Sequence, residues 1–320
     1  MDKLLRILII GAGGIGAYYG ARLRVAGHAV TFVARGAHLE AMQSGTLQVE
    51  HPDFHFQGAV DAVSAEQLIA SRAADDFDLV LLTTKAGSTR ELMAQLGNWL
   101  QSNPQLRVLS LQNGVDNEPG IAELIGNQRT LGGLAVRIGG HVLAPGHISA
   151  TGPAQVVTGA WPNAGKNAVN TELLARIEQQ FNQAGIPTRL SDDIQLELWK
   201  KLLINNGVNP LSALTEMDTR TLTHHPRFEH TVYALMQEVV LAARADEVII
   251  SDDDLNAMYE LIRNFDAIKT SMLVDYEKGR PLELDEIAGA VCERVERLGQ
   301  RAPVTELVRG LLELKLQKRA

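Results

Sequence analysis

The sequence predicts an α/β protein with a doubly wound, mostly parallel sheet in its N-terminal part and an all-helical C-terminal part. Short apolar runs alternate with amphipathic stretches from residue 4 to about 137. The first of these runs leads directly into a glycine-rich turn, and strand-like runs end near residue 190. Alternating strand and helix patterns are typical of a parallel sheet covered by helices. We therefore expect two domains, 1–190 and 191–320, each long enough to form its own core.

The composition excludes several classes of protein. With 320 residues, 45% hydrophobic and 21% charged, the chain has an ordinary globular composition. Its net charge of -8 and its lack of a Lys/Arg run argue against nucleic acid as a partner. No segment reaches the roughly 18 apolar residues of a membrane helix, so we expect a soluble protein without membrane contact. The single cysteine, Cys292, forms no internal disulfide and belongs to no metal motif, which favours a cytoplasmic protein without a metal.

The N-terminal strands are predicted from their apolar runs. The first run is too short for a signal core and enters the turn at once, so it is expected to be a buried strand. Two later runs, 141–150 and 155–159, are rich in β-formers and broken by Gly and Pro. We expect them to extend one edge of the sheet as antiparallel strands. The five expected parallel strands are 4–10, 29–34, 78–83, 107–111 and 130–136.

Beyond the sheet the pattern becomes helical. A helix is expected over about 168–184 and a short strand over 187–190, and everything from Ser191 onward is expected to be helical. Two clusters, 191–193 and 251–254, place a serine and several aspartates before an apolar periodic segment. Such residues satisfy free N–H groups at a helix start, so we interpret both clusters as caps and not as metal ligands.

A dinucleotide-binding fingerprint follows the first strand. In a G-x-G-x-x-G motif the first glycine, Gly11, allows a tight turn, and Gly13 lets the backbone approach a pyrophosphate. Gly16 permits close packing of the next helix, expected over 17–26, whose N-terminus supplies N–H donors to phosphate. The motif indicates a Rossmann-type domain in which the cofactor-binding residues are Gly11, Ala12, Gly13, Gly14, Ile15 and Gly16.

The end of the second strand carries the choice of cofactor. Arg35 lies about 20 residues after the glycines, where an acidic residue in NAD-binding domains contacts the ribose 2′-hydroxyl. A guanidinium at this place suits a 2′-phosphate, which an acid would repel. The sequence therefore predicts NADP (NADPH) as the cofactor.

A polar cluster lies on an otherwise apolar helix at 192–209. At 100° per residue, Lys201 and Asn205 fall on the apolar side of this helix, with Asn209 nearby, whereas Lys200 falls on its more polar side. A lysine and two amides directed into one space suit a developing alkoxide and a carboxylate. The helix alone leaves a second interpretation open, in which Lys201 pairs with Glu197 at the surface and the asparagines are caps.

Taken together, these motifs resemble the ketopantoate reductases (2-dehydropantoate 2-reductases), NADPH enzymes of pantothenate biosynthesis. The resemblance extends over the whole chain. The residues that carry it, in order, are Gly11-x-Gly13-x-x-Gly16, Arg35, Thr83-Thr84-Lys85, Leu111-Gln112-Asn113-Gly114-Val115, Glu197-x-Trp199-x-Lys201-x-x-x-Asn205-x-x-x-Asn209-Pro210-Leu211, Ser271-Met272 and Glu283-x-Asp285.

The resemblance implies a role for each candidate residue. Lys201 would be the general acid that protonates the carbonyl oxygen, and Glu283 would orient the substrate hydroxyl and the lysine. Lys85 and Asn113, after two strand ends, would lie between cofactor and substrate, and Glu283 would also contact the cofactor. The residues that would hold a small keto-acid substrate are Asn205, Asn209 and Ser271, together with Lys85 and Asn113.

Several alternatives stay open at this point. The chain could reduce another 2-keto acid, resemble β-hydroxyacid dehydrogenases, or bind NADPH as a regulator without turnover. The stretch 214–226 matches no pattern that points to ketopantoate. An apolar stripe over 304–316 suggests a homodimer, although the same stripe could pack internally.

Overall fold

A computed structural model describes residues 3–319 of the chain. The chain forms two compact units. The first comprises the residues up to Gln112 together with Asn117–Ile194, and the second comprises Asn113–Asp116 and the residues from Gln195 on. The second unit thus begins a few residues after the expected boundary at 190, and it includes a short segment that the sequence places in the N-terminal domain.

The first unit is built around an eight-stranded sheet, which confirms the predicted fold class. The strands pair in the order β12-β11-β8-β7-β6-β1-β2-β5, and all neighbours are parallel except β11 and β8. The strands are β1 (Arg6–Ile10), β2 (Ala29–Val33), β5 (Asp61–Val63), β6 (Leu79–Leu82), β7 (Arg107–Ser110), β8 (Thr130–Val136), β11 (Gln155–Ala160) and β12 (Thr188–Leu190).

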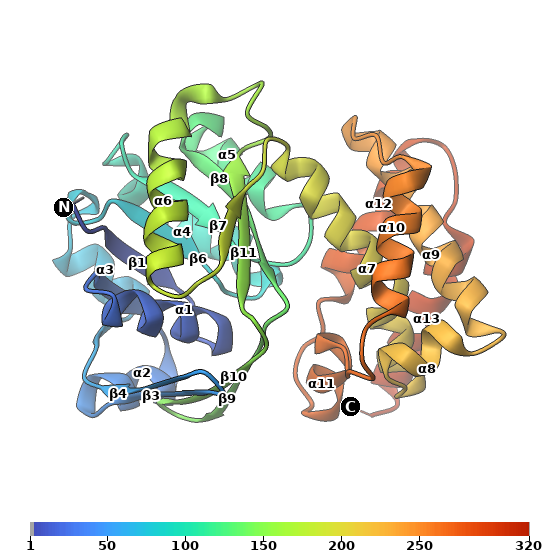
Figure 1. The fold of residues 1–320 in the computed structure, drawn as a ribbon, viewed down its shortest axis with the longest axis horizontal. Helices are drawn as coiled ribbons and strands as arrows, with labels where there is room; N and C mark the ends of the chain where they lie inside the picture. Colours follow the sequence, from blue (N-terminus) through green and yellow to red (C-terminus); the bar gives the residue numbers. More distant parts are fainter. Residues whose placement is uncertain (1–2, 320) are drawn as a thin grey trace. The chain divides into compact units, whose positions relative to one another are not determined.

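Helices cover both faces of this sheet (Figure 1). Ile7 and Ile9 of β1 belong to one core with α1 (Gly14–Val25) and α6 (Thr171–Gln183). The alternate residues of β1, Leu8 and Ile10, belong to a second core on the opposite face. Burial on both faces explains why this strand is apolar throughout. The helices of the second core are α3 (Ala65–Ser71), α4 (Thr89–Gln101) and α5 (Asn117–Ile125).

The prediction that 141–150 extends the main sheet is wrong. This run forms β9 (Gly139–Ala144) and β10 (His147–Thr151) of a separate four-stranded sheet, in the order β4-β3-β10-β9. Its other strands, β3 (Leu47–His51) and β4 (Phe54–Gly58), alternate apolar and polar residues and were not predicted. The small sheet lies at one end of the first unit, against α1 (Figure 1). Of the two edge runs, only β11 joins the main sheet.

The second unit is helical, as predicted, and contains no strand between residues 195 and 319. The long helix α7 (Ile194–Thr215) is largely buried, and the amide of Asn206 donates to the Leu235 carbonyl oxygen and to Thr305 Oγ1, both at 3.1 Å. The other helices are α8 (Thr219–His224), α9 (Phe228–Ala243), α10 (Asp252–Arg263), α11 (Ser271–Glu277), α12 (Ala290–Arg297) and α13 (Pro303–Gln317). A π-helical turn, η6 (Asp285–Gly289), leads into α12, and α2 (Gly36–Ser44) belongs to the first unit.

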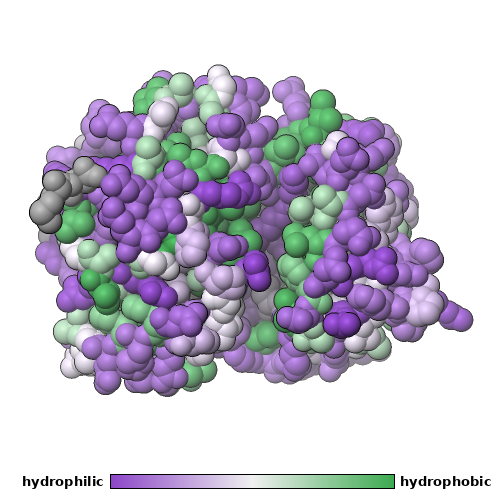
Figure 2. Space-filling view, viewed as in Figure 1, coloured by the Kyte–Doolittle hydropathy of each residue, from purple (hydrophilic) through white to green (hydrophobic). Residues whose placement is uncertain are grey.

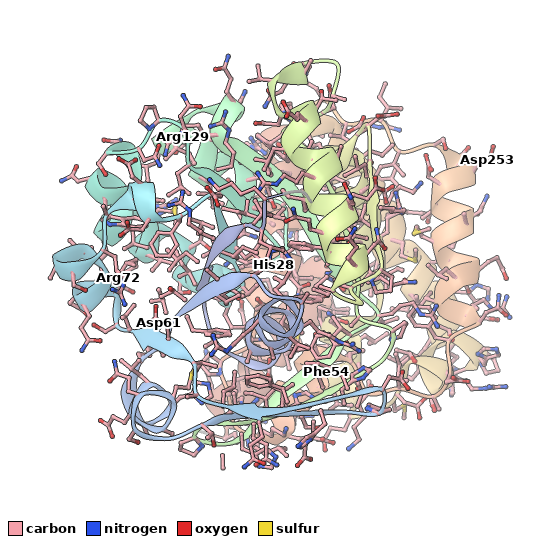
Figure 3. All side chains as sticks on the ribbon, turned by 60° about the vertical axis from the view of Figure 1, so that its left-hand side comes forward. His28, Phe54, Asp61, Arg72, Arg129 and Asp253 are labelled. Atoms are coloured by element: carbon pink, nitrogen blue, oxygen red, sulfur yellow. The ribbon has the colours of Figure 1, made fainter. Side chains whose placement is uncertain are left out.

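The two serine-aspartate clusters form capping contacts at the starts of α10 and α7. Ser251 caps α10 in a capping box with Asp254, and Asp253 projects from the same first turn (Figure 3). Ser191 Oγ accepts from the Asp193 N–H at 3.2 Å, just ahead of α7. Among residues 3–319, no group of three His, Cys, Asp or Glu side chains is placed to hold a metal ion.

Hydrophilic side chains cover most of the face shown in Figure 2. Within the part of the chain that the structure describes, no helix combines the length and apolarity needed to cross a membrane. Leu307, Leu311 and Leu314 form an exposed stripe on α13, and their exposed fractions are 45–62%. A homodimer joined through this stripe stays a prediction.

Candidate active site

The glycine loop has a shape that side chains would disrupt. Gly11 has a φ of +103°, a conformation that favours glycine, directly after β1. A Cβ atom at Gly16 would lie 2.2 Å from the Gly11 carbonyl oxygen, so this glycine is needed for the close approach of helix and loop. The helix begins at Gly14 and not at residue 17 as expected. The last glycines of the motif therefore form the first turn of α1.

Gly13 and Gly14 differ in what surrounds them. A Cβ atom at Gly13 would have no other heavy atom within 4 Å, and the residue has an ordinary φ of -71°. At Gly14 the same atom would lie 2.0 Å from the carbonyl carbon of Gly140 in β9. Open space at Gly13, in front of the first N–H groups of a helix, fits an anionic group such as a pyrophosphate.

His38 connects the glycine loop to Gly146 through two hydrogen bonds of its ring. The Gly146 N–H donates to its Nδ1 at 3.0 Å, so that nitrogen is an acceptor, and Nε2 donates to the Ala12 carbonyl oxygen at 2.8 Å. The two bonds fix the neutral tautomer with the proton on Nε2. This contact was not predicted, because nothing in the sequence near His38 marks it as a neighbour of the loop.

Arg35 lies at the same edge of the sheet as the glycine loop. It is exposed and forms the N-cap position of α2, directly after β2. The N–H groups of Gly11 and Ala12 donate to the Val33 carbonyl oxygen at 3.1 and 3.3 Å. The end of β2 is therefore adjacent to the loop, where an adenosine ribose phosphate would be bound if a dinucleotide occupied it.

The loops after β6 and β7 lie at this edge as well. Lys85 follows β6 and is exposed, and it precedes the short helix η2 (Ala86–Ser88). The Gln112 amide, after β7, donates to the Thr84 carbonyl oxygen at 3.0 Å and to Thr89 Oγ1 at 2.8 Å. These bonds fix the two loops against each other. Gln112 is part of the resemblance, but its role was not predicted.

In the second unit, three predicted residues follow one another along α7. Lys201 and Asn205 are partly buried, and Asn209 is only 5% exposed. Lys200 differs from Lys201, because its Nζ pairs with Asp254 Oδ1 of the α10 capping box at 2.6 Å.

Glu283 and Asn113 meet directly in the second unit. The Asn113 amide donates to Glu283 Oε2 at 3.0 Å, and Glu283 is 8% exposed. Burial, together with the charges of Glu283, Asp285 and Asp116, raises the pKa of the nearby Glu286 carboxyl. Acidic side chains therefore gather around this pair.

Ser271 lies at the start of α11. It is exposed, and the preceding Thr270 caps the helix by accepting from the Leu273 N–H at 3.1 Å. The predicted residues are thus divided between the units. The first unit carries the glycine loop, Arg35 and Lys85, and the second carries Asn113, Lys201, Asn205, Asn209, Ser271 and Glu283.

A glycine loop on a doubly wound sheet, followed by a helical unit with a lysine, amides and a carboxylate, defines the class of two-domain dehydrogenases. Residues 7–163 match the family described as ketopantoate reductase PanE/ApbA, and 193–316 match its C-terminal domain. The chain belongs to the ketopantoate reductase family. It is an oxidoreductase that acts on CH–OH groups, and membership supports a nicotinamide cofactor.

Curated relatives and solved structures agree with this family. The chain is 31% identical to 2-dehydropantoate 2-reductase of a Nostoc species over 92% of this chain and 90% of the relative. It is 28% identical to the enzyme of that name from Pyrococcus horikoshii, over 97% of both chains. A PanE/ApbA family ketopantoate reductase from Ralstonia eutropha superposes with a TM-score of 0.84, at 28% identity and 98% coverage of both chains. A D-mandelate dehydrogenase gives a TM-score of 0.87 over 98% of both chains, but at 20% identity this likeness shows the fold alone.

Proposed function

We propose that the chain is an NADPH-dependent ketopantoate reductase that forms pantoate for pantothenate biosynthesis in the cytoplasm. One observation carries the proposal. Asn209 is only 5% exposed and lies about two turns beyond the partly buried Lys201 on α7, with Asn205 between them. A lysine and two side-chain amides along one stretch of helix suit a polar ligand that accepts hydrogen bonds from them. The names of the relatives support the same substrate.

The residues of the first unit fit the cofactor. We assign the pyrophosphate to the loop Gly11, Ala12, Gly13, Gly14, Ile15 and Gly16, because Gly13 borders open space at a helix N-terminus. Arg35 would bind the 2′-phosphate with its exposed guanidinium. Lys85, Asn113 and Glu283 would contact the nicotinamide half. When bound, NADPH supplies the hydride that is added to the ketone carbon.

The second unit would supply the proton and hold the substrate. Lys201 donates a proton from its ammonium to the carbonyl oxygen as negative charge grows there, which leaves a neutral amine and an alcohol. Asn205, Asn209 and Ser271 donate to the substrate carboxylate or its oxygens. Glu283, oriented by the Asn113 amide, accepts from the hydroxyl group of ketopantoate and keeps the lysine in place. Glu283 thus supplies an acceptor that matches a substrate hydroxyl.

The test is NADPH oxidation with ketopantoate beside two related 2-keto acids, ketoisovalerate, which lacks the hydroxyl group, and phenylglyoxylate. We expect kcat/KM for ketopantoate to exceed that for ketoisovalerate by at least about 100-fold, because a site built to bond a hydroxyl rejects analogues without it. A higher kcat/KM for either analogue would assign the chain to another 2-keto acid. Tight NADPH binding without oxidation by any of the three would favour a regulator.

A further inference from the structure

Residues 113–116 are held at both ends by side chains of one stretch of the second unit, 283–294. At one end the Asn113 amide donates to Glu283 Oε2 at 3.0 Å. At the other end Arg294 Nη2 pairs with Asp116 Oδ1 at 2.6 Å. Glu283 directly precedes the helical stretch that carries Arg294, in which the π-helical turn runs into α12. π-Helical turns of this kind are frequent at functional sites.

Arg294 is the central residue of this arrangement. Its side chain is 5% exposed, and its Nε also pairs with Asp246 Oδ2 at 2.6 Å. The guanidinium lies 5.4 Å from the centroid of the Trp199 ring, and Trp199 is two residues before Lys201 on α7. Burial lowers the pKa of Arg294, but the hydrogen bonds and charges of Asp116 and Asp246 outweigh burial and raise it above its ordinary value. One side chain therefore contacts the segment, α7 and the start of the α9–α10 connection.

The segment 113–116 contains a glycine between its two ends. Gly114 has a φ of +94°, a region open to glycine, and such a residue gives the backbone more freedom than any other. Without the contact at Asp116, this glycine would be the most flexible point of the segment. The ion pair at Asp116 removes that freedom, because a charge-assisted hydrogen bond between well-aligned groups is strong and directional.

We propose that Arg294 is a positioning residue that acts through Asp116 and Asn113 on Glu283. Its ion pair with Asp116 fixes the segment 113–116, and the fixed segment keeps the Asn113 amide on the Glu283 carboxylate. The effect on turnover rests on the proposed function of Asn113 and Glu283. The effect on the segment does not depend on that function.

Removal of Arg294 itself would leave the carboxylate of Asp246 without its buried partner, so the sharper variant is Asp116→Asn. The Asp116 side chain is 54% exposed, and the change leaves the Arg294–Asp246 pair intact. We expect kcat with ketopantoate to fall about tenfold, because a small misplacement near reacting groups is costly in rate. The KM for NADPH should change less than kcat, since the glycine loop and Arg35, which would hold the phosphates, are untouched.

Asp246→Asn is the matched control. Asp246 pairs with the same guanidinium at the same 2.6 Å and also with Arg297 at 2.8 Å, and its side chain is only 18% exposed. A purely structural Arg294 predicts that this more buried variant loses the more activity. We expect Asp246→Asn to lose less activity than Asp116→Asn, with a kcat within about twofold of the parent. Its melting temperature should nevertheless be the lower of the two. Equal or greater loss of kcat in Asp246→Asn would overturn the proposal.

Two further measurements separate the possible failures. In the double variant Asn113→Ala/Asp116→Asn, the second change should add no loss to the first, because it acts through Asn113. Additive losses would contradict that route.

Hydrogen exchange by mass spectrometry should show faster exchange over 113–116 in Asp116→Asn and not in Asp246→Asn. Faster exchange in a chain that reduces no keto acid would reject the proposed function alone, and unchanged exchange would reject the positioning role.

Discussion

The glycine loop and the polar side chains of the second unit, among them the α7 cluster of Lys201, Asn205 and Asn209, are two regions of different construction. In the loop of the first unit, six consecutive residues shape a space, and the absence of side chains at Gly13 and Gly16 is what matters. In the second unit, Asn113, Lys201 and Glu283 come from distant parts of the sequence, and their functional groups are what matters. A methyl group added to the loop and a functional group removed from the cluster should therefore have different consequences.

The largest expected effect is on the cluster, from Lys201→Ala. If Lys201 is the proton donor, kcat should fall by about 10²- to 10⁴-fold, the usual contribution of a general acid. Lys200→Ala is the matched control on the same helix, because Lys200 is engaged with Asp254 at 2.6 Å. Its kcat should stay within about threefold, with a stability loss of about 1 kcal/mol or less from a partly exposed pair. Similar losses of kcat in the two variants would remove Lys201 from the mechanism.

The second effect concerns the glycine loop, where a methyl group is added at either of two neighbouring residues, Gly13 or Gly14. Gly13→Ala meets no atom within 4 Å, so we expect an unchanged melting temperature and a KM for NADPH raised about tenfold, because the methyl takes the space of the pyrophosphate. Gly14→Ala meets the Gly140 backbone at 2.0 Å and should lower the free energy of unfolding by about 1–3 kcal/mol. Thermal unfolding and NADPH titration distinguish the two, and a destabilised Gly13→Ala would contradict the assignment of open space.

The comparison also explains what could be predicted from the sequence. The glycine loop is contiguous, so its spacing and the flanking elements identify it. The helix start was placed three residues late, because glycines carry no apolar pattern that marks a first turn. The run 141–150 was assigned to the wrong sheet, because its pairing partner β3 lies about a hundred residues earlier.

The α7 cluster was predictable only in part. Helical periodicity separated Lys201 from Lys200, and the structure pairs Lys200 with Asp254 of another helix. Periodicity could not predict the bond between Asn113 and Glu283, which are 170 residues apart. Arg294 was missed entirely, since a buried guanidinium is recognised only by its partners Asp116 and Asp246, and both are remote in sequence.

The third effect tests whether the loop region selects the phosphate-bearing cofactor. Arg35→Ala should raise the KM for NADPH about 10- to 100-fold, the value of one to two charge-assisted hydrogen bonds, and leave the KM for NADH within about threefold. Arg35 is exposed, so the change should not alter the melting temperature. Parallel steady-state kinetics with the two cofactors measure this, and an equal rise for NADH would mean that Arg35 does not contact the 2′-phosphate.

The smallest effect concerns stability and has opposite signs in the two units. Burial and neighbouring acids raise the folded-state pKa of Glu286. The protonated form is thus favoured by folding, and this contribution is complete below the ordinary value of 4.5 and lost as the pH rises through the raised pKa. Glu286→Gln should therefore raise the melting temperature by about 1–3 °C at pH 7, with a smaller gain near pH 4.

Asp78 of the first unit is the counterpart with a lowered pKa. Burial alone raises the pKa of this carboxyl, but its hydrogen bonds and ion pair with Arg6, 2.7 Å away, lower it below the ordinary value of 3.8. That stabilisation is present above the ordinary value and is lost as the pH falls through the lowered pKa. Asp78→Asn should therefore lower the melting temperature at pH 7 and converge with the parent in strong acid. Melting curves of both variants across this range test the contrast, and shifts of the same sign at pH 7 would show that the acids around Glu283 do not repel Glu286.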